Sequence, residues 1–544
     1  MNNTHSVVEG SERVPLPGAR ALGAVNPGAV IEVTLKLRRK SPLPNLSDKP
    51  SKPLTRTELG DKYGASKADA DAVTAALTPF GLKVVNTNLP TRTIQLSGTA
   101  AALERAFDVK LLNYAHESGD YRGRIGNVHV PTEIDKMVEA VFGLDNRRVA
   151  RRRRQPPRDK SPMRSTSAGI PAAWYTPAEL ATHYQFPPGD GAGQTVGVLE
   201  FGGGYFPQDL AKFCELANLG TPPSVKALSL DGTSTSAHDG AEGEVMLDVE
   251  IVAGACPKAS IVAYFAQFTE QGWITALDAG VHDQENDPGV ISVSWGYAEK
   301  KDVWTSQAMK QVNQTLLEAA HLGVTVCVAA GDDGSSDAIA DGHAYTDFPS
   351  TSPYALAVGG TTIPTKGGKE PDIVWKEGDG LRSDQGGSTG GGCSAIFPRP
   401  PWQEAFEIPS VNPHAIAGRL VPDLSANADW DASPYLLVVD GHAQGNGGTS
   451  AATPLVASLI TLINAQKVAA GKSRVGFLTP QLYQQAATGG GGGGGGTIGS
   501  LGCTDVTSGN NVTAKVGGYQ AGAGYDAASG WGTPIGTRLS TLLP

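Results

Sequence analysis

The segment GGTSAATP, Gly447 to Pro454, joins a glycine turn to a long apolar helix that is expected to run to Ile463. Ser450 falls at the start of this helix, where backbone N–H groups and the helix dipole favour negative charge. A serine hydroxyl there suits a nucleophile whose attack creates an oxyanion. Pro454 is tolerated because it lies in the first turn. The structural alternative for Ser450 is an N-cap serine without chemistry.

A serine nucleophile needs a general base, and the usual base is histidine. None of the histidines beyond the amino-terminal segment lies in the HGTHVAG-like helix start that subtilisins use. His238, in SAHDGAEGE, is the only one near a motif, and its alternative is a solvated loop histidine.

Carboxylates offer a different base. In GEVMLDVE, Glu244 and Asp248 are four residues apart, so a helix places them one turn apart on one face, while Glu250 faces elsewhere. The apolar residues around them predict a buried helix, although such pairs are often only surface charge. Two buried carboxylates side by side must share a proton or find a partner, so we expect perturbed pKa values.

A third acidic candidate stands in AAGDDGS, Ala329 to Ser335, where Asp332 comes just past an apolar run. A protonated carboxyl in this place can donate a hydrogen bond to an oxyanion, provided that its pKa is raised or the medium is acidic. The alternative is an aspartate in a strand-end turn.

Apolar runs separated by amphipathic, helix-length segments must position these side chains. The runs are TVGVLEF (195–201), ASIVAYFA (259–266), GVISVSWG (289–296) and VTVCVAAG (324–331). This alternation predicts an α/β fold with a mostly parallel sheet flanked by helices on both faces. Ligands of such sheets bind at the carboxyl ends of the strands, and Glu200, Trp295 and Asp332 all stand where a run ends.

Residues 1–146 are predicted to form a small α+β domain, with strands near Val30 to Leu37 and Thr91 to Leu96 and helices near Lys67 to Leu77 and Ala100 to Phe107. Residues 147–170, rich in Arg, Pro and Ser, are expected to be an exposed linker with a processing site within about 154–172. The alternative is a solvated basic loop. The glycine run Gly489 to Gly496 is expected to be a flexible surface loop.

Charge is divided unequally along the chain. Residues 1–170 hold 27 Lys+Arg against 17 Asp+Glu, a net charge of +10, and residues 171–544 hold 17 against 37, a net charge of −20. A nucleic-acid binder should carry its positive charge on the folded body, so we expect an intramolecular partner and no nucleic acid.

The composition excludes several classes of protein. With 40% hydrophobic and 18% charged residues the chain is too apolar for disorder, and its glycines are too aperiodic for collagen. The five cysteines form neither a disulfide framework nor a CxxC pair and are expected to be buried thiols. No secretory signal and no membrane span is expected, which leaves other export routes open.

The chain resembles the sedolisins, or serine-carboxyl peptidases, and most closely their kumamolisin branch. The motifs that carry the resemblance cover almost all of residues 171–544 in the family's order: YTPAEL, YQFP, LEFGGGY, EGEVMLDVEI, SVSWG, AAGDDGS, DFPSTSPY, STGGG, FPRPPWQ, NGGTSAATP and QAGAGYD. Residues 1–146 resemble the family's ferredoxin-like activation propeptide less distinctly. The resemblance implies a subtilisin-like catalytic domain made as a self-processing zymogen.

The resemblance also implies a role for each candidate. Ser450 matches the nucleophile that forms an acyl-enzyme, Glu244 the general base and Asp248 the carboxylate that orients it. Asp332 matches the oxyanion-hole acid, which works with the backbone N–H of Ser450.

Other matching positions lie around this centre. Glu200 and Trp295 match an outer hydrogen-bonding network that extends the Glu-Asp pair. The SWG and STGGG segments match the edges of the substrate cleft, with which an extended peptide would pair. Five positions match this cleft: Ser294, Gly296, Asp347, Gly390 and Gly391. Asp347 would favour basic residues in a substrate.

Near the carboxyl end, Asp505, Val506, Gly522, Gly524 and Asp526 resemble the family's calcium loop. The resemblance implies one structural Ca²⁺ held by carboxylate and main-chain oxygens. The alternative is aspartates that cap turns.

A glutamate base and a protonated oxyanion acid act together only in acid, so an acidic optimum is expected. We expect the basic propeptide to cover the acidic catalytic body near neutrality and to be released as carboxylates protonate. The resemblance further implies an extracellular monomer that acts on polypeptides, with no membrane partner.

Two other functions stay open at this stage. One is a Ser-His-Asp protease with His238 as its base. The other is an inactive homologue that binds peptides or a cell surface, against which the joint presence of Ser450, Glu244, Asp248 and Asp332 argues.

Asp333 departs from the family, which usually has serine there, and gives GDDG in place of GDSG. A second negative charge beside Asp332 should raise the pKa of Asp332 and keep it protonated at milder pH. We therefore predict that Asp333→Ser shifts the alkaline limb of the pH–rate profile toward acid. An unchanged profile would show that Asp333 does not act in this way.

Overall fold

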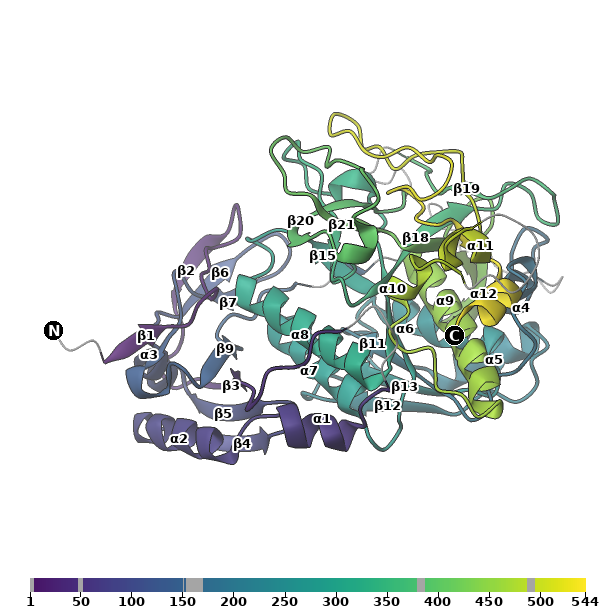
Figure 1. Ribbon diagram of the computed structural model, residues 1–544. Helices are drawn as coiled ribbons and strands as arrows, with labels where there is room; N and C mark the ends of the chain where they lie inside the picture. Colours follow the sequence, from purple (N-terminus) through teal and green to yellow (C-terminus); the bar gives the residue numbers. More distant parts are fainter. Residues whose placement is uncertain (1–3, 47–51, 150, 153–169, 379–386, 487–494) are drawn as a thin grey trace. The chain divides into compact units, whose positions relative to one another are not determined.

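A computed structural model describes residues 4–46, 52–149, 151–152, 170–378, 387–486 and 495–544. Most of the predicted linker, and the glycine run up to residue 494, therefore lie outside the described residues. The chain divides into two compact units, which are described separately (Figure 1). Unit 1 consists of Met1–Ala150, Gln267–Gln284 and Lys300–Glu318, and unit 2 consists of Arg151–Ala266, Glu285–Glu299 and Ala319–Pro544.

Unit 2 is built on an eight-stranded sheet with the order β12-β13-β11-β14-β16-β18-β19, and β22 also pairs with β18. Every pairing is parallel except that of β19. The strands are β11 (Thr195–Glu200), β12 (Val225–Ser229), β13 (Ser260–Phe265), β14 (Val290–Val293), β16 (Thr325–Ala329), β18 (Leu356–Thr362), β19 (Ile373–Val374) and β22 (Leu424–Asn427). The predicted mostly parallel sheet is confirmed.

Two helices of unit 2 carry the candidate residues, and they pack on each other and on this sheet. Helix α6 (Glu242–Ala255) is buried from Gly243 to Ala255, as expected of a helix that is apolar on most of its surface. Helix α9 (Thr449–Ala469) follows Gly448, whose φ of 93° suits glycine and turns the chain into the helix. Pro454 lies near the helix start and is accommodated there.

The other elements of unit 2 are short. The strand pairs are β20 (Gly392–Pro398) with β21 (Gly418–Val421), β23 (Tyr435–Val439) with β24 (His442–Asn446), and β25 (Cys503–Thr504) with β26 (Thr533–Pro534). A further sheet joins β10 (Arg151–Arg152), β15 (Trp295–Ala298) and β17 (Asp347–Phe348). The helices are α4 (Pro177–His183), α5 (Pro207–Leu216), α10 (Thr479–Leu482), α11 (Ile498–Gly502) and α12 (Gly536–Leu542).

Unit 1 contains a four-stranded antiparallel sheet with the order β4-β5-β3-β9, together with helices α2 and α3. This order with two intervening helices is the ferredoxin-like arrangement, as predicted. The elements are β3 (Val30–Leu37), α2 (Lys67–Leu77), β4 (Lys83–Asn88), β5 (Thr93–Thr99), α3 (Ala100–Phe107) and β9 (Val138–Phe142). Strand β5 begins two residues later than predicted because Arg92 has a φ of 62°, which interrupts an extended chain.

The remaining elements of unit 1 include two helices from far along the sequence. These are α7 (Glu270–His282) and α8 (Ser306–Leu322), of which unit 1 contains the residues up to Glu318. The others are α1 (Arg56–Tyr63), β1 (His5–Val7) paired with β8 (His129–Pro131), and the sheet of β2 (Arg20–Ala24), β6 (Leu112–Ala115) and β7 (Tyr121–Gly123). The compact unit thus extends beyond the sequence boundary at residue 146.

Glu318 on α8 is the centre of a buried ion cluster in unit 1. Its carboxylate pairs with Arg39, with Arg92 at 3.7 Å and with His282 at 2.5 Å. Burial acts to raise the pKa of Glu318, but Arg39, His282 and Arg92 outweigh it and hold that pKa well below its usual value. The cluster therefore stabilises unit 1 only while Glu318 is ionised.

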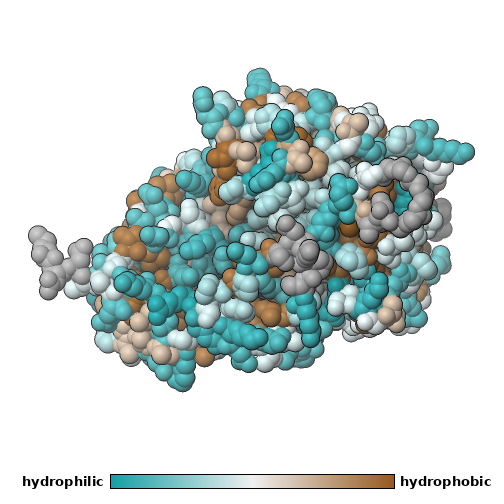
Figure 2. Space-filling view, viewed as in Figure 1, coloured by the Kyte–Doolittle hydropathy of each residue, from teal (hydrophilic) through white to brown (hydrophobic). Residues whose placement is uncertain are grey.

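All five cysteines are buried free thiols, as predicted. On the face shown in Figure 2, apolar side chains lie in small patches separated by hydrophilic ones. Within the described part of the chain, no helix is long and apolar enough to span a bilayer.

We predict that Glu318→Gln lowers the free energy of unfolding of unit 1 by about 3 kcal/mol at pH 7, because it leaves buried cations without their partner. A carboxyl whose folded pKa is depressed adds stability above its unfolded pKa and loses it as pH falls through the folded pKa. The difference in the free energy of unfolding between Glu318→Gln and the parent should therefore be smaller at pH 3. Urea denaturation in a Ser450→Ala background measures both values.

The control for this experiment is Asp71→Asn, which breaks an exposed ion pair with Lys67. Exposed pairs contribute little, so this variant should be close to the parent at both pH values. An equally small effect of Glu318→Gln would contradict the importance of the buried cluster.

Candidate active site

Ser450 lies in the first turn of α9 and is fully buried. Its Oγ donates a long hydrogen bond of 3.4 Å to the carbonyl of Ser294, at the carboxyl end of the sheet. The Ser294 hydroxyl lies 2.6 Å from Asp248 Oδ1 and 3.2 Å from the carbonyl of Ser450. A hydroxyl has one proton, and the shorter contact directs it to Asp248. Ser294 thus links the α9 turn to α6.

The sequence predicted Ser294 only as an edge of the substrate cleft and missed the function of its hydroxyl in this link. The signal that could have revealed it is a small polar side chain at the end of the apolar run GVISVSWG, where a parallel sheet presents its functional residues.

Three carboxyl groups lie together in the interior of unit 2. Glu244 and Asp248 stand one turn apart on α6, and Glu200 ends β11; all three are fully buried. The indole Nε1 of Trp295 donates a hydrogen bond of 3.2 Å to Glu200 Oε2. The predicted acidic pair is thus part of a buried trio.

Burial and repulsion from neighbouring carboxyls raise the pKa values of two members of this trio, Asp248 and Glu200. For Asp248 the largest cause is burial, followed by repulsion from Glu200 and Glu244, and the hydrogen bond from Ser294 opposes them. For Glu200 burial is again the largest cause, Glu244 adds to it, and the bond from Trp295 opposes it. Both pKa values lie well above the usual range, so these groups hold protons far more readily than exposed carboxyls do.

Asp332 contacts Thr449, the residue that precedes Ser450. Its Oδ1 accepts hydrogen bonds from Thr449 N at 2.8 Å and from Thr449 Oγ1 at 2.6 Å, and its side chain is buried. Because Thr449 immediately precedes Ser450, the Asp332 carboxyl stands beside the backbone N–H groups that begin α9. The neighbouring Asp333 is also buried.

Strand β15, the SWG segment, has partners on both edges. On one edge Ala298 pairs with Asp347 of β17, and on the other Gly296 and Trp295 pair with Arg151 and Arg152 of β10. Both pairings are antiparallel. The edge that was predicted to receive an extended peptide therefore receives an extended segment of this chain.

Gly390 and Gly391 lie where the STGGG segment packs against the end of β16. Gly390 N donates a hydrogen bond of 2.7 Å to Gly331 O, and a Cβ on Gly390 would stand 2.0 Å from Ala330 O. Gly391 has a φ of 151° and also has backbone too close for a side chain. Close backbone approach explains both glycines, by Ala330 next to the Asp332 turn for Gly390 and by Ala527 for Gly391.

The five predicted calcium ligands meet in one loop cluster. Asp505 Oδ2 accepts a hydrogen bond from Gly524 N at 2.8 Å, and Asp526 Oδ2 accepts one from Gly522 N at 3.0 Å. The carbonyl of Val506 accepts a hydrogen bond of 3.5 Å from Ser529, whose hydroxyl also contacts Asp526.

This cluster has the donors that Ca²⁺ prefers, which are carboxylate and carbonyl oxygens. Burial raises the pKa of Asp526 against the opposing bonds from Gly522, Ala528 and Ser529. Among the described residues, no lysine or arginine forms an ion pair with Asp505 or Asp526. The residues present fit a hard cation.

His238 lies apart from the nucleophile candidate in its contacts. It stacks on Phe206 and pairs through Nδ1 with Asp440 Oδ1 at 3.2 Å, and its side chain is 61% exposed. Ser450 is fully buried and its hydroxyl contacts Ser294. The geometry gives no support to a triad with His238 as base.

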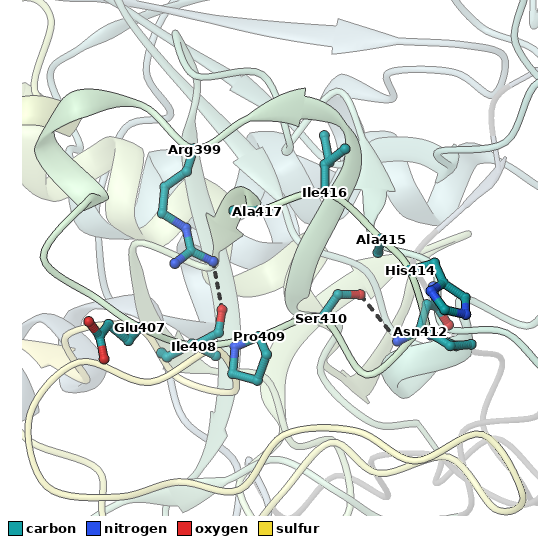
Figure 3. Close-up of a pocket in the computed structure, with 11 residues that line it drawn as sticks. Arg399, Glu407, Ile408, Pro409, Ser410, Asn412, His414, Ala415, Ile416 and Ala417 are labelled. Atoms are coloured by element: carbon teal, nitrogen blue, oxygen red, sulfur yellow. Dashed lines mark hydrogen bonds between the residues drawn. The ribbon is translucent and has the colours of Figure 1, made fainter.

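A pocket of about 460 Å³ lies elsewhere in unit 2, along the loop between β20 and β21. The Arg399 guanidinium donates to the carbonyl of Ile408 at 2.6 Å and supports the loop, and Asn412 N donates to Ser410 Oγ (Figure 3). None of the candidate catalytic residues lines this pocket.

Comparison with known proteins gives consistent matches. Residues 17–147 match the family model for the pro-kumamolisin activation domain, and residues 232–490 match that of the subtilase family. Kumamolisin from Bacillus sp. (strain MN-32) is 40% identical over 99% of this chain and 96% of its own length. Sedolisin from Pseudomonas sp. (strain 101) is 29% identical over 95% of this chain and 87% of its own.

A solved structure is also similar. Pseudomonas sedolisin in complex with pseudo-iodotyrostatin superposes with a TM-score of 0.57 at 29% identity, over 68% of this chain and 98% of that chain.

We predict that Glu200→Gln raises the free energy of unfolding of unit 2 at pH 7, because burial raises the pKa of Glu200 and makes its ionised form costly there. A carboxyl whose folded pKa is raised contributes stability in acid, and this contribution is lost as pH rises from the unfolded pKa toward the folded one. The amide of the glutamine does not ionise, so the variant does not lose this stability as pH rises. The amide can still accept the Trp295 hydrogen bond. The gain should therefore disappear at pH 4.

Urea denaturation in a Ser450→Ala background at the two pH values measures this difference. Glu215→Gln, at an exposed position on α5, is the control and should be neutral at both. An equal loss of stability for Glu200→Gln at pH 4 and pH 7 would contradict a protonated Glu200.

Proposed function

Because the chain belongs to the sedolisin family of serine-carboxyl peptidases, we propose that it is an acid-active endopeptidase in which Ser450 attacks the peptide bond. One observation carries the proposal: Ser294 accepts a hydrogen bond from Ser450 Oγ at its carbonyl and donates one from its hydroxyl to Asp248 of the α6 acidic pair. A serine at a helix start is thereby coupled to a carboxyl, and among the described residues no histidine forms a hydrogen bond with Ser450.

Glu244 is the proposed general base. It takes the proton of Ser450 Oγ as that oxygen bonds to the substrate carbonyl carbon. When the tetrahedral intermediate collapses, the bond to the amine breaks and Glu244 returns the proton to the leaving nitrogen. Water then attacks the acyl-enzyme and gives a proton to Glu244. Glu244 passes this proton to Ser450 Oγ as the acyl–oxygen bond breaks, which releases the acid product and restores free Ser450.

Asp332 and Asp248 support these steps in different ways. The oxyanion accepts hydrogen bonds from the backbone N–H of Ser450 and from protonated Asp332, whose carboxyl is held beside α9 by Thr449. Asp248 and Glu200 retain protons because burial raises their pKa values. As neutral groups they do not repel the ionised Glu244. Both requirements are met best in acid.

Residues 1–146 are the propeptide in this proposal, and the match to an activation domain supports that assignment. The pairing of Arg151 and Arg152 with β15 has the form expected of a substrate backbone in the cleft. Loss of the Glu318 ion cluster in acid would loosen unit 1. Self-processing would then follow at a bond within about 154–172.

We further propose that Asp505, Val506, Gly522, Gly524 and Asp526 hold one structural Ca²⁺. The ion would neutralise two carboxylates that, among the described residues, accept hydrogen bonds from backbone N–H groups and from the Ser529 hydroxyl. Polypeptide substrates, an extracellular site of action and a monomeric state complete the proposal.

Incubation of the purified chain with a denatured protein substrate from pH 3 to 8 tests the central proposal. We expect cleavage and loss of about the first 170 residues in acid, and Ser450→Ala should reduce both at least about 10³-fold. His238→Ala should process itself and digest substrate like the parent, because no proposed step uses that side chain.

Three outcomes would each reject the mechanism. They are full maturation and activity of Ser450→Ala, loss of activity in His238→Ala while its fold is intact, and a rate that does not change from pH 4 to pH 8.

Calcium removal is tested separately. Chelation should lower the melting temperature of Ser450→Ala by several degrees, since an ion present at about 100 times its Kd contributes about 2.7 kcal/mol. Asp526→Asn should melt lower and respond less to the chelator. An unchanged melting temperature of the parent would remove the calcium proposal and leave the catalytic one intact.

A further inference from the structure

His238, Glu242 and Asp440 form a cluster outside the catalytic residues. They come from the loop before α6, from the first residue of α6 and from the turn between β23 and β24. Each offers one ligand atom, and the three atoms lie within 4.8 Å of one another. His238 Nδ1 and Asp440 Oδ1 lie 3.2 Å apart.

The His238 side of the cluster is held in place by packing and by a turn. The imidazole stacks on Phe206 with ring centroids 4.2 Å apart and planes 24° apart. Asp239 Oδ1 accepts hydrogen bonds from Gly203 N and Ala241 N, which fixes the loop between His238 and α6. The ring therefore presents Nδ1 without a large rearrangement.

The Asp440 side is held equally firmly. The carboxylate of Asp209 on α5 accepts hydrogen bonds of 2.8 Å from the N–H groups of Asp440 and Gly441. Lys212 Nζ donates a bond of 2.7 Å to the carbonyl of Gly441. Both edges of the cluster are therefore preorganised, which lowers the cost of binding a ligand.

The charges of the cluster favour a cation. Two carboxylates face one imidazole, and within the described part of the chain neither Glu242 nor Asp440 pairs with a lysine or arginine. The other charged groups around it already have hydrogen-bond partners. The carboxylates of Asp209 and Asp239 accept hydrogen bonds from backbone N–H groups, and Lys212 donates one to the carbonyl of Gly441.

We propose that His238, Glu242 and Asp440 bind a divalent transition-metal ion, with Zn²⁺ as the best fit. An imidazole nitrogen with two carboxylate oxygens is a borderline donor set that suits Zn²⁺ and disfavours Ca²⁺ and Mg²⁺. Tetrahedral ligands about 2.1 Å from zinc lie roughly 3.4 Å apart, close to the present His238–Asp440 separation. The Glu242 carboxylate needs only to move closer to His238 and Asp440 for all three to bind the ion, and water fills the fourth coordination position.

The ion would connect two elements that no backbone pairing joins. Glu242 begins α6 and stands two residues before Glu244, so the metal ties the start of this helix to the β23–β24 turn. Zinc requires a neutral imidazole and ionised carboxylates, so protons compete with it in acid. The site is filled near neutrality and emptied in acid.

Calorimetric titration of the full-length Ser450→Ala chain with ZnCl₂ at pH 7.5, with Ca²⁺ present in excess, tests the site. We expect one Zn²⁺ per chain. His238→Ala and Glu242→Gln should each weaken binding at least about 10-fold. At pH 4.5 the parent should lose most of its affinity.

The matched control is His343→Ala. His343 pairs with Asp341 at 3.4 Å in another exposed loop, and the described residues add no third ligand to that pair. This variant should bind Zn²⁺ like the parent. The melting temperature of each variant without metal checks that its fold is intact.

Titration with Co²⁺ gives a second readout, because visible absorption bands report nitrogen and oxygen ligands directly. Bands in the parent that are lost in His238→Ala and kept in His343→Ala support the site. The proposal is overturned if the parent binds no zinc at micromolar concentrations, or if folded His238→Ala and Glu242→Gln bind it as tightly as the parent does.

Discussion

The structure depends on carboxyl groups buried in an apolar interior. Glu200, Glu244 and Asp248 occupy the interior of unit 2, where an isolated negative charge is far less stable than in water. Protons on Glu200 and Asp248 reduce that charge, and the hydrogen bonds from Ser294 and Trp295 determine where negative charge is best tolerated. The surrounding apolar helix α6 is what makes this arrangement possible, because it excludes the water that would otherwise solvate each carboxylate.

The two units respond to protons in opposite directions. Glu318 in unit 1 is surrounded by Arg39, Arg92 and His282, so its ionised form is favoured and acid weakens the cluster. In unit 2 the protonated forms of Glu200 and Asp248 are favoured, so acid strengthens the interior. Within one chain, the Glu318 cluster is thus favoured near neutrality and the protonated Glu200 and Asp248 are favoured in acid.

Much of the fold could be predicted from local patterns. The apolar runs located four strands of the parallel sheet, β11, β13, β14 and β16, and helical periodicity gave α2 and α3 to the residue. The grouping of α7 and α8 with residues 1–150 could not be predicted, because it depends on ion pairs such as Lys36 with Asp278, more than two hundred residues apart. Similarly, spacing revealed Glu244 and Asp248, but the partners of Ser294 and Thr449 arise only when distant segments meet.

The pairing of β10 with β15 has a kinetic consequence. A segment tethered to the edge that it occupies is present there at an effective concentration in the millimolar range, whatever the concentration of the protein. Once the chain is cut beyond this segment, only the contacts of residues 1–150 with α7 and α8 keep the strand near this edge. Occupancy of the edge would then depend on a non-covalent association, and dilution would favour release of the strand without any change in its contacts to β15.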